Sequence, residues 1–392
     1  MGGSIMASTI NSDTSNGLIL TPDTTGEIEL QSAGTTQAKI TSSGLQNASG
    51  NPITSQAGQN RIIKGNMSIA QRATSVTGIT ATGYNTVDRW KQQLSGGGTY
   101  TQAQTALTSS DAAFADGFSQ SVKYDCTTAY TSANSFSVHR QIIEGQNLQQ
   151  LAYGTSSAKS VTLSFWVKSN VTGTAVASLY SVDSNKQISQ TYTIDATNTW
   201  EYKTVTFAGD TASAFDNDNA ASLYVNLVMA TGTDYTSGTL PLTWTTYANA
   251  NFAAGQTIDI SASTSNEIAF TGIQLEANTT ATPFEHLQYG QQLALCQRYY
   301  EKIVDSLLQA TLGDTYATST SPVPVINLAF KEVKRAAPTM GTVGTFTTSN
   351  TSGSQVIRGG ENTFNAYYLA AGAGRAYFYP DANSGWSADS EL

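Results

Sequence analysis

Apolar and polar residues alternate in short runs along most of this chain, and clusters of Gly, Asn, Asp and Ser separate the runs. Such a period of two is typical of a strand that buries one face and exposes the other. The clearest run spans residues 160–168, with Val161, Leu163, Phe165 and Val167 on one face and Thr162, Ser164, Trp166 and Lys168 on the other. Because helical periodicity is scarce, the sequence predicts an all-β fold.

Six further runs predict strands before residue 290. They cover residues 119–126, 135–143, 175–182, 200–207, 222–229 and 267–275. Many short strands spaced by turn residues favour two packed antiparallel sheets over a parallel α/β sheet. We therefore predict a jelly-roll β-sandwich over residues 59–290.

Residues 1–58 differ from the sandwich region, because only short β pieces occur in a Ser-, Gly-, Asn- and Thr-rich background. The pieces lie at residues 17–22, 26–30 and 38–41. Strands this short expose unpaired edges and cannot form a core alone. The segment is predicted to be a stalk or attachment region, and a disordered Ser/Thr-rich tail is the alternative.

After residue 290, a helical pattern precedes a second β region. Leu293, Cys296, Tyr300 and Ile303 recur at three- and four-residue spacing, which predicts a hinge helix over residues 291–303. From Pro322 onward the β signals return. Residues 291–392 are therefore predicted to hold a hinge helix and a small C-terminal β domain.

The charge balance and the hydropathy pattern exclude several classes of partner. Lys and Arg total 19 against 28 Asp and Glu, so the formal charge is -9 and nucleic-acid binding is disfavoured. No apolar run approaches the length of a membrane span, and the first residues lack the basic and apolar parts of a signal peptide. We expect no membrane insertion and a non-secretory protein.

Catalytic signatures are absent. The chain has no G-x-S-x-G elbow, no phosphate-binding G-x-x-x-x-G-K-[ST] loop and no H-E-x-x-H helix. Its two histidines, His139 and His286, offer few candidates for a base or a metal ligand. Glycoside hydrolysis needs only two carboxylates, and no particular pair stands out, so we expect a non-enzymatic protein.

One acidic loop is a candidate for a structural calcium ion. Asp210, Asp216 and Asp218 crowd a segment that also holds Asn217 and Asn219. Calcium prefers such oxygen ligands, although the spacing is not that of an EF-hand. The alternative is an ordinary polar turn, which Asp and Asn also favour. No other cofactor is expected.

Aromatic residues on polar segments are candidates for sugar binding, because proteins stack aromatic rings on the C–H faces of sugars and flank them with hydrogen-bonding groups. The candidates are Trp166, Trp200, Trp244 and Tyr247. For each of them the alternative is packing at the edge of the core.

Several segments together resemble a family of tail-fibre and related virion proteins of bacteriophages, especially marine phages. The resemblance lies in residues 60–75, 84–90, 272–276, 281–286, 289–301, 330–339 and 385–392. Residues 161–168 and 200–207 are in addition similar to jelly-roll carbohydrate-binding modules. Together these similarities cover residues 58–392, and weakly the first 58.

The resemblance implies a virion appendage without enzymatic activity, a homotrimer whose N-terminus attaches to other virion proteins and whose β domains face the host. Cys126 and Cys296, expected to be unpaired, fit assembly in a reducing host cytoplasm. We expect a tail-fibre subunit that binds host-surface polysaccharide. The alternatives are a structural head fibre, decoration protein or tail connector, and a polysaccharide depolymerase.

Overall fold

The computed structural model describes residues 28–32, 35–41, 44–47, 58–304, 315–317 and 322–392. The chain forms two compact units, one of residues 1–57 with Thr280–Pro283, the other of Gly58–Thr279 with Phe284–Leu392. Strands dominate both, which confirms the predicted all-β class. In the described part of the chain, neither α-helix has the length and apolar character needed to cross a bilayer.

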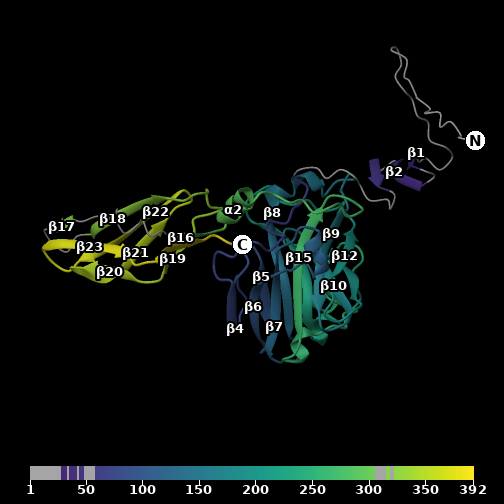
Figure 1. Ribbon diagram of the computed structural model, residues 1–392, viewed down its shortest axis with the longest axis horizontal. Coiled ribbons are helices and arrows are strands. Elements are labelled where there is room, and N and C mark those ends of the chain that lie inside the picture. Colours follow the sequence, from purple (N-terminus) through teal and green to yellow (C-terminus); the bar gives the residue numbers. More distant parts are fainter. Residues whose placement is uncertain (1–27, 33–34, 42–43, 48–57, 305–314, 318–321) are drawn as a thin grey trace, which may run out of the picture. The chain divides into compact units, whose positions relative to one another are not determined.

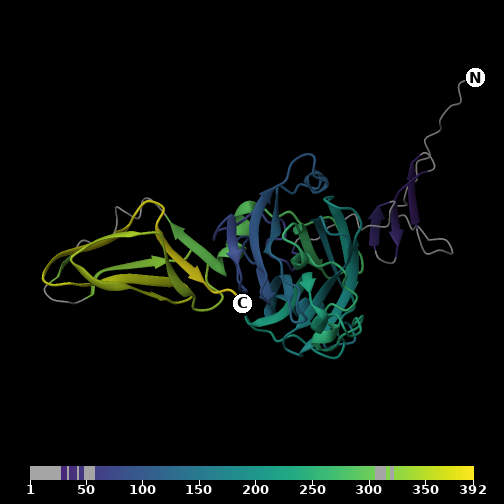
Figure 2. The same ribbon diagram turned by 90° about the horizontal axis from the view of Figure 1, so that it is seen from below.

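The larger unit contains a sandwich of two six-stranded antiparallel sheets (Figures 1 and 2). Sheet I runs in the order β12 (Glu201–Phe207), β9 (Val161–Ser169), β15 (Glu267–Glu276), β7 (Gln120–Thr128), β6 (Thr99–Ala106) and β4 (Ser75–Ile79). Sheet II runs in the order β14 (Thr245–Thr246), β11 (Lys186–Ile194), β10 (Gly173–Ser181), β13 (Ala221–Thr231), β8 (Phe136–Glu144) and β5 (Lys91–Ser95). Successive strands from β7 to β10 alternate between the sheets, as in a jelly roll.

The alternation in the sequence separates the core from the outer faces. Val161, Leu163, Phe165 and Val167 of β9 are fully buried between the sheets, as predicted. The Phe165 ring meets the Tyr192 ring of sheet II edge-on, with centroids 5.0 Å apart. All seven predicted strands are present, but β4, β5, β6, β11 and β14 are not among the predictions, because their polar residues hide the period of two.

Two segments that carry the family resemblance lie side by side. The Arg61 N–H donates to the Leu275 carbonyl (2.8 Å), and the Ile273 N–H donates to the Gly65 carbonyl (3.0 Å). A Cβ on Gly65 would lie 1.9 Å from the Ile273 carbonyl oxygen, so only glycine allows this approach. Gly272 has a φ of +62°, which glycine adopts without strain, at the irregular position of β15.

Trp90 and His139 form a buried stack inside the sandwich. Their ring centroids lie 4.1 Å apart, and the Trp90 Nε1–H donates to the Lys64 carbonyl (3.1 Å). The His139 Nδ1 pairs with the Tyr124 hydroxyl (2.6 Å), and burial lowers the pKa of His139 to about 3. Trp90 and His139 therefore belong to the core.

Helix α2 (Tyr289–Gln297) is shorter than predicted, because strand β16 (Tyr300–Val304) begins where the predicted helix continues. Tyr300, Ile303 and Val304 favour strands, and β16 pairs with β24 (Gly385–Asp389) over its whole length. A pairing of segments about ninety residues apart thus overrides the local helical spacing. The second α-helix, α1 (Ala112–Ala115), is a single turn beside sheet I.

The C-terminal region contains three three-stranded antiparallel sheets (Figure 1). Their orders are β16–β24–β19 (Thr339–Val343), β17 (Thr315–Ala317)–β23 (Gly374–Pro380)–β20 (Phe346–Ser349), and β18 (Pro322–Ala329)–β22 (Thr363–Ala370)–β21 (Thr351–Gly359). Phe330, Phe364, Phe378 and Trp386 are buried in one apolar cluster. The predicted return to β structure after residue 322 is confirmed.

Buried ion pairs join this region to the sandwich. Arg89, which is almost fully buried, pairs with Glu391, and its guanidinium carbon lies 3.4 Å from the centroid of the Tyr299 ring. Glu144 at the end of β8 accepts two hydrogen bonds from Arg298, at 2.9 and 3.0 Å, and a third from the Tyr299 hydroxyl. Cys126 and Cys296 are both buried and free.

The smaller unit contains one antiparallel sheet, with β2 (Thr35–Thr41) between β1 (Ile28–Ser32) and β3 (Gly44–Asn47). This confirms the predicted β pieces at residues 26–30 and 38–41, whereas the piece at residues 17–22 lies outside the described residues. Cross-strand pairing places Leu30, Ile40 and Leu45 on one face, and all three are exposed. The sheet has no core of its own.

Asp88, fully buried beside the Trp90 stack, predicts a pH effect on stability. Its Oδ1 accepts from the Gln71 N–H (2.9 Å), and burial raises its pKa to about 6. The unfolded chain ionises near the ordinary pKa, so the folded state loses stability as the pH rises from about 4 to 6. Asp88→Asn cannot ionise, and its stability relative to wild type should be about 3 kcal/mol higher at pH 7 than at pH 4.

Urea unfolding of both proteins at pH 4 and pH 7 measures this difference. The same substitution at the exposed Asp234 is the control, and it should give no comparable change. An Asp88→Asn difference that stays constant over this pH range would show that burial does not raise the pKa of Asp88.

Candidate functional site

Three tyrosine side chains meet on the outer face of sheet II. Tyr180 on β10 pairs across the sheet with Tyr224 on β13, and their ring centroids lie 5.4 Å apart. Tyr247, just after β14, meets Tyr180 edge-on at 5.1 Å. All three rings are half-buried, so each keeps part of its surface open.

Strand alternation explains why these rings face outward. Leu179 and Val225, next to Tyr180 and Tyr224 in the chain, point into the core and are fully buried. Neighbouring side chains of a strand point to opposite faces, so the tyrosines lie on the outside. The Tyr180 hydroxyl donates to Asn185 Oδ1 (3.0 Å), which fixes the ring from the β10–β11 turn.

Polar side chains flank the rings on the neighbouring strands. The Arg140 guanidinium carbon, from β8, lies 4.6 Å from the centroid of the Tyr224 ring. Its Nε donates to Asn226 Oδ1 (2.6 Å), and its Nη1 donates to Gln93 Oε1 (3.2 Å). We call these six residues, Tyr180, Tyr224, Tyr247, Arg140, Asn226 and Gln93, the tyrosine face.

Part of the remaining outer face of sheet II is covered. Phe252 and Ala253, from the segment after β14, pack on Val138, Val176 and Val228 of the sheet and form a separate apolar cluster. Tyr247 also contacts this cluster. The tyrosine face is therefore an open strip beside a covered half of the sheet.

Partial burial changes the acid–base properties of the tyrosine face. Burial lowers the pKa of Arg140 to about 10, against the opposing influence of Tyr224 and Tyr247. Burial also raises the pKa values of Tyr180 and Tyr247. At neutral pH the phenols of Tyr180 and Tyr247 are therefore uncharged and Arg140 is a cation.

This arrangement suits the recognition of a sugar. Aromatic rings offer apolar surface to the C–H groups of a sugar, and the phenol, amide and guanidinium groups hydrogen-bond its hydroxyls. Aromatic rings with a few placed polar groups are typical of small-ligand sites. Chemically, the tyrosine face is equipped to bind and shows no nucleophile–base pair.

Of the four predicted sugar-binding residues, only Tyr247 belongs to the tyrosine face. Trp244 packs against the main core instead: its Nε1–H donates to the Ala208 carbonyl (2.7 Å), and its ring meets Tyr153 edge-on at 5.8 Å. The structure thus places Trp244 at the edge of the core, and its role in sugar binding stays a prediction.

The other two tryptophans lie on the outer face of sheet I. Trp200 is only 7% exposed, and its Nε1–H donates to Asp111 Oδ1 (2.9 Å), so its ring is packed and its role in sugar binding stays a prediction. Trp166 is half-buried, and its ring lies 5.5 Å from that of Tyr202, which is 44% exposed. Trp166 and Tyr202 therefore form a second, smaller aromatic surface on the opposite side of the sandwich.

The structure does not assemble the predicted calcium ligands. Asp210 is buried and paired with Lys186 (2.8 Å), whereas Asp216 and Asp218 are exposed. The Asp218 Oδ1 accepts from the Ala220 N–H (2.9 Å), as in an ordinary Asx turn. Among the residues that the structure describes, no three acidic, His or Cys side chains group as metal ligands. The structure thus gives Asp210 an ion pair and Asp218 a turn contact, and the calcium site stays a prediction.

The sequence prediction missed Tyr180, Tyr224 and Arg140. Each occupies a polar-face position of a predicted strand, so the alternation that located the strands also pointed these side chains outward. The missing information was the pairing, because only the β10–β13 and β13–β8 registers bring the three together.

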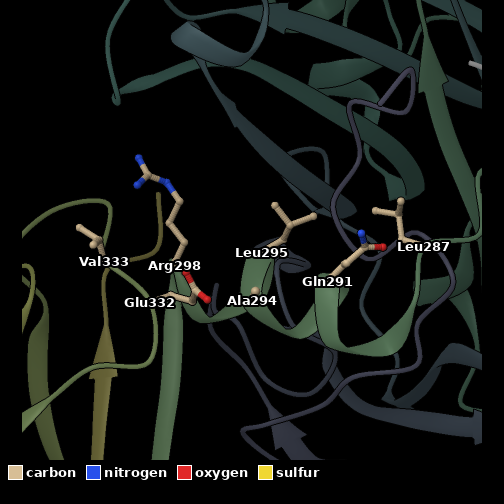
Figure 3. A pocket seen from close by; sticks show the side chains of 7 residues that line it. All are labelled: Leu287, Gln291, Ala294, Leu295, Arg298, Glu332 and Val333. Carbon is tan, nitrogen blue, oxygen red and sulfur yellow. The ribbon is translucent and has the colours of Figure 1, made fainter. Parts of the chain in front are cut away.

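A shallow hollow of about 520 Å³ lies beside α2 (Figure 3). Its lining comes from α2 and the adjoining turns, and from the loop after β18, namely Leu287, Gln291, Ala294, Leu295, Arg298, Glu332 and Val333. It holds no aromatic ring, and Arg298 is already bound to Glu144. The hollow therefore lacks the groups that make the tyrosine face suitable for sugars.

No protein-family model matches this sequence, and no curated protein matches it. Solved structures with similarity include the enzymatically active domain of bacteriophage CBA120 tailspike protein 4, at 13% identity and a TM-score of 0.29. The alignment covers 56% of this chain and 21% of the tailspike chain.

Two further similar structures are carbohydrate-binding modules. The family 11 module of Clostridium thermocellum, in complex with a β-1,3-1,4-mixed-linked tetrasaccharide, has 13% identity and a TM-score of 0.25, over 55% of this chain and 99% of its own. The CBM22-1 xylan-binding domain of Paenibacillus barcinonensis has 13% identity and a TM-score of 0.20, over 48% of this chain and 87% of its own. At these scores no neighbour assigns a function to this chain.

Proposed function

We propose that the sandwich binds polysaccharide of a host cell surface across the tyrosine face, and that the chain is a non-enzymatic subunit of a bacteriophage tail fibre. The observation that carries the binding role is the cluster of three half-buried tyrosines beside Arg140. The sequence motifs that resemble phage virion proteins support the tail-fibre role.

The same proposal includes a homotrimer on the virion. The exposed apolar residues Leu30, Ile40 and Leu45 give the N-terminal sheet a face that needs a covering partner. Three copies of a weak sugar site would bind together, and linked sites gain avidity through their effective concentration.

The test of the binding role is adsorption of the labelled protein to a broad panel of bacterial cells, with and without periodate oxidation of their surface sugars. Wild type should bind a few strains in a periodate-sensitive manner. Tyr180→Ala removes the ring that contacts both other tyrosines and should weaken adsorption at least tenfold. Its melting temperature should change little, because the ring lies outside the main core.

Tyr202→Ala is the control, since it removes a more exposed tyrosine from the opposite sheet. If Tyr202→Ala abolishes adsorption and Tyr180→Ala does not, the site lies at Trp166 and Tyr202. Absence of adsorption to every strain would favour the structural virion role over the adhesin.

One observation bears on the depolymerase alternative. Asp125 and Glu267 lie opposite each other on the outer face of sheet I, but Lys123 binds both carboxylates, at 2.8 and 3.1 Å. The single positive charge of Lys123 therefore compensates one of the two negative charges. Release of reducing ends from the bound polysaccharide, measured in the same adsorption experiment, separates cleavage from binding.

A further inference from the structure

Arg140 is a cation without an acidic partner at the edge of the tyrosine face. Its two hydrogen bonds go to the neutral side-chain oxygens of Asn226 and Gln93. No ion pair in the described part of the chain involves Arg140. Arg72, Arg89 and Arg298 have carboxylate partners, whereas the buried Lys64 donates to the neutral side chains of Ser68 and Gln292. Charged groups withdrawn from water are normally paired, and Arg140 is the unpaired cation that lies against the tyrosines.

The charged neighbour of Arg140 on the sheet does not supply the missing negative charge. Lys91 on β5 lies directly opposite Arg140 in the strand register, and like charges in this position repel. Burial, and then the charge of Arg140, lower the pKa of Lys91, whereas Glu391 and Asp389 raise it. Glu391 and Asp389 thus raise the pKa of Lys91, whereas the groups that raise the pKa of Arg140 are tyrosines. Arg140 and Lys91 therefore place two cations side by side in this part of sheet II.

The unused donors of Arg140 fit a carboxylate. The Nη2 donates no hydrogen bond among the described residues, and the Nη1 has a second N–H beyond the one given to Gln93. The guanidinium group is planar and binds carboxylates in a two-pronged manner. Because Arg140 lies over the Tyr224 ring, an anion bound there would adjoin a sugar that stacks on the tyrosines.

We infer that the tyrosine face selects an acidic polysaccharide, in which Arg140 binds the carboxylate of a uronic or similar acidic sugar. The inference rests on the proposed function, since it names the class of glycan for the same site. Neutral glycans lack the group that compensates Arg140, so they bind more weakly. The attraction between charges also makes binding weaker at high salt.

The test uses the full-length protein and an array of bacterial capsular and O-antigen polysaccharides. Each polysaccharide is printed native and after carbodiimide–borohydride reduction, which converts its carboxylates to alcohols. Wild type should bind carboxylate-bearing glycans and lose about tenfold to a hundredfold in affinity on the reduced forms. Arg140→Gln should bind native and reduced forms equally and weakly.

Arg358→Gln is the matched control, because it removes the same charge from an exposed site on β21 and should bind as wild type does. Arg140→Gln should keep the wild-type melting temperature, since the variant removes an uncompensated part-buried charge. Equal binding of native and reduced glycans by wild type would overturn the inference and leave the proposed function standing. If no glycan binds, or if Tyr180→Ala binds as wild type does, the proposed function fails as well.

Discussion

Arg89→Met should destabilise the protein by about 3–5 kcal/mol, since it leaves a partner carboxylate buried without its main counter-ion. Glu391, which is 4% exposed, pairs with Arg89 and lies 3.5 Å from Arg72 Nη1. The substitution also removes the hydrogen bond from Arg89 to the Ile142 carbonyl (2.7 Å) and the contact with the Tyr299 ring. Urea unfolding, followed by tryptophan fluorescence, measures the loss.

Two further variants separate charge from packing. Arg89→Met combined with Glu391→Leu removes both members of the pair and should recover much of the lost stability. Lys123→Met breaks a half-exposed pair with Asp125 and should cost less than 1 kcal/mol. A loss below about 1 kcal/mol for Arg89→Met would mean that water reaches the pair and screens it.

Lys334→Met is expected to have a similarly large effect, of about 3–5 kcal/mol, in the C-terminal region. Lys334 is fully buried, and its Nζ donates to Glu301 Oε2 (2.6 Å), the Gln297 carbonyl (2.6 Å) and the Glu332 carbonyl (3.2 Å). All three protons of the ammonium group are therefore used. The substitution leaves the carboxylate of Glu301, which is as buried as Lys334, without its counter-ion. Glu301 then keeps the longer hydrogen bonds from the Lys331 N–H.

Hydrogen exchange of the amides of α2 and β16 detects this effect better than global unfolding does, because this region can open without unfolding of the sandwich. Lys331→Met, on the same loop but exposed, is the control and should leave the exchange unchanged. If Lys334→Met protects these amides as well as wild type does, the buried pair does not hold the loop onto α2.

Local patterns in the sequence predicted the strands well and the binding site poorly. The run Val161, Leu163, Phe165 and Val167 located β9 and its buried face because alternation is a property of consecutive residues. Tyr180, Tyr224 and Arg140 come from three strands, and nothing local to any one of them indicates that they are neighbours. The helix predicted to reach Ile303 failed for the same reason, since β24 decides the structure of β16.

The tryptophans illustrate how composition can mislead. Trp200 begins a strand beside polar residues, which suggested an exposed ring, but Asp111 binds its indole N–H and the residues around α1 cover it. Burial of a bulky ring at a strand end removes a large apolar area from water and stabilises the core. Tyr180, Tyr224 and Tyr247, whose smaller rings bear a hydroxyl, remain half-buried on the outer face of sheet II.

The position of β15 sets the order in which this chain can fold during its synthesis. β15 is the last strand of the sandwich to be made, yet it lies in the middle of sheet I and pairs with both β9 and β7. Until residue 276 has left the ribosome, sheet I exists at most as two halves with open edges. Open edges recruit other chains, and such non-local pairing is slow. The yield of folded protein should therefore depend on the rate of translation more than on the final stability.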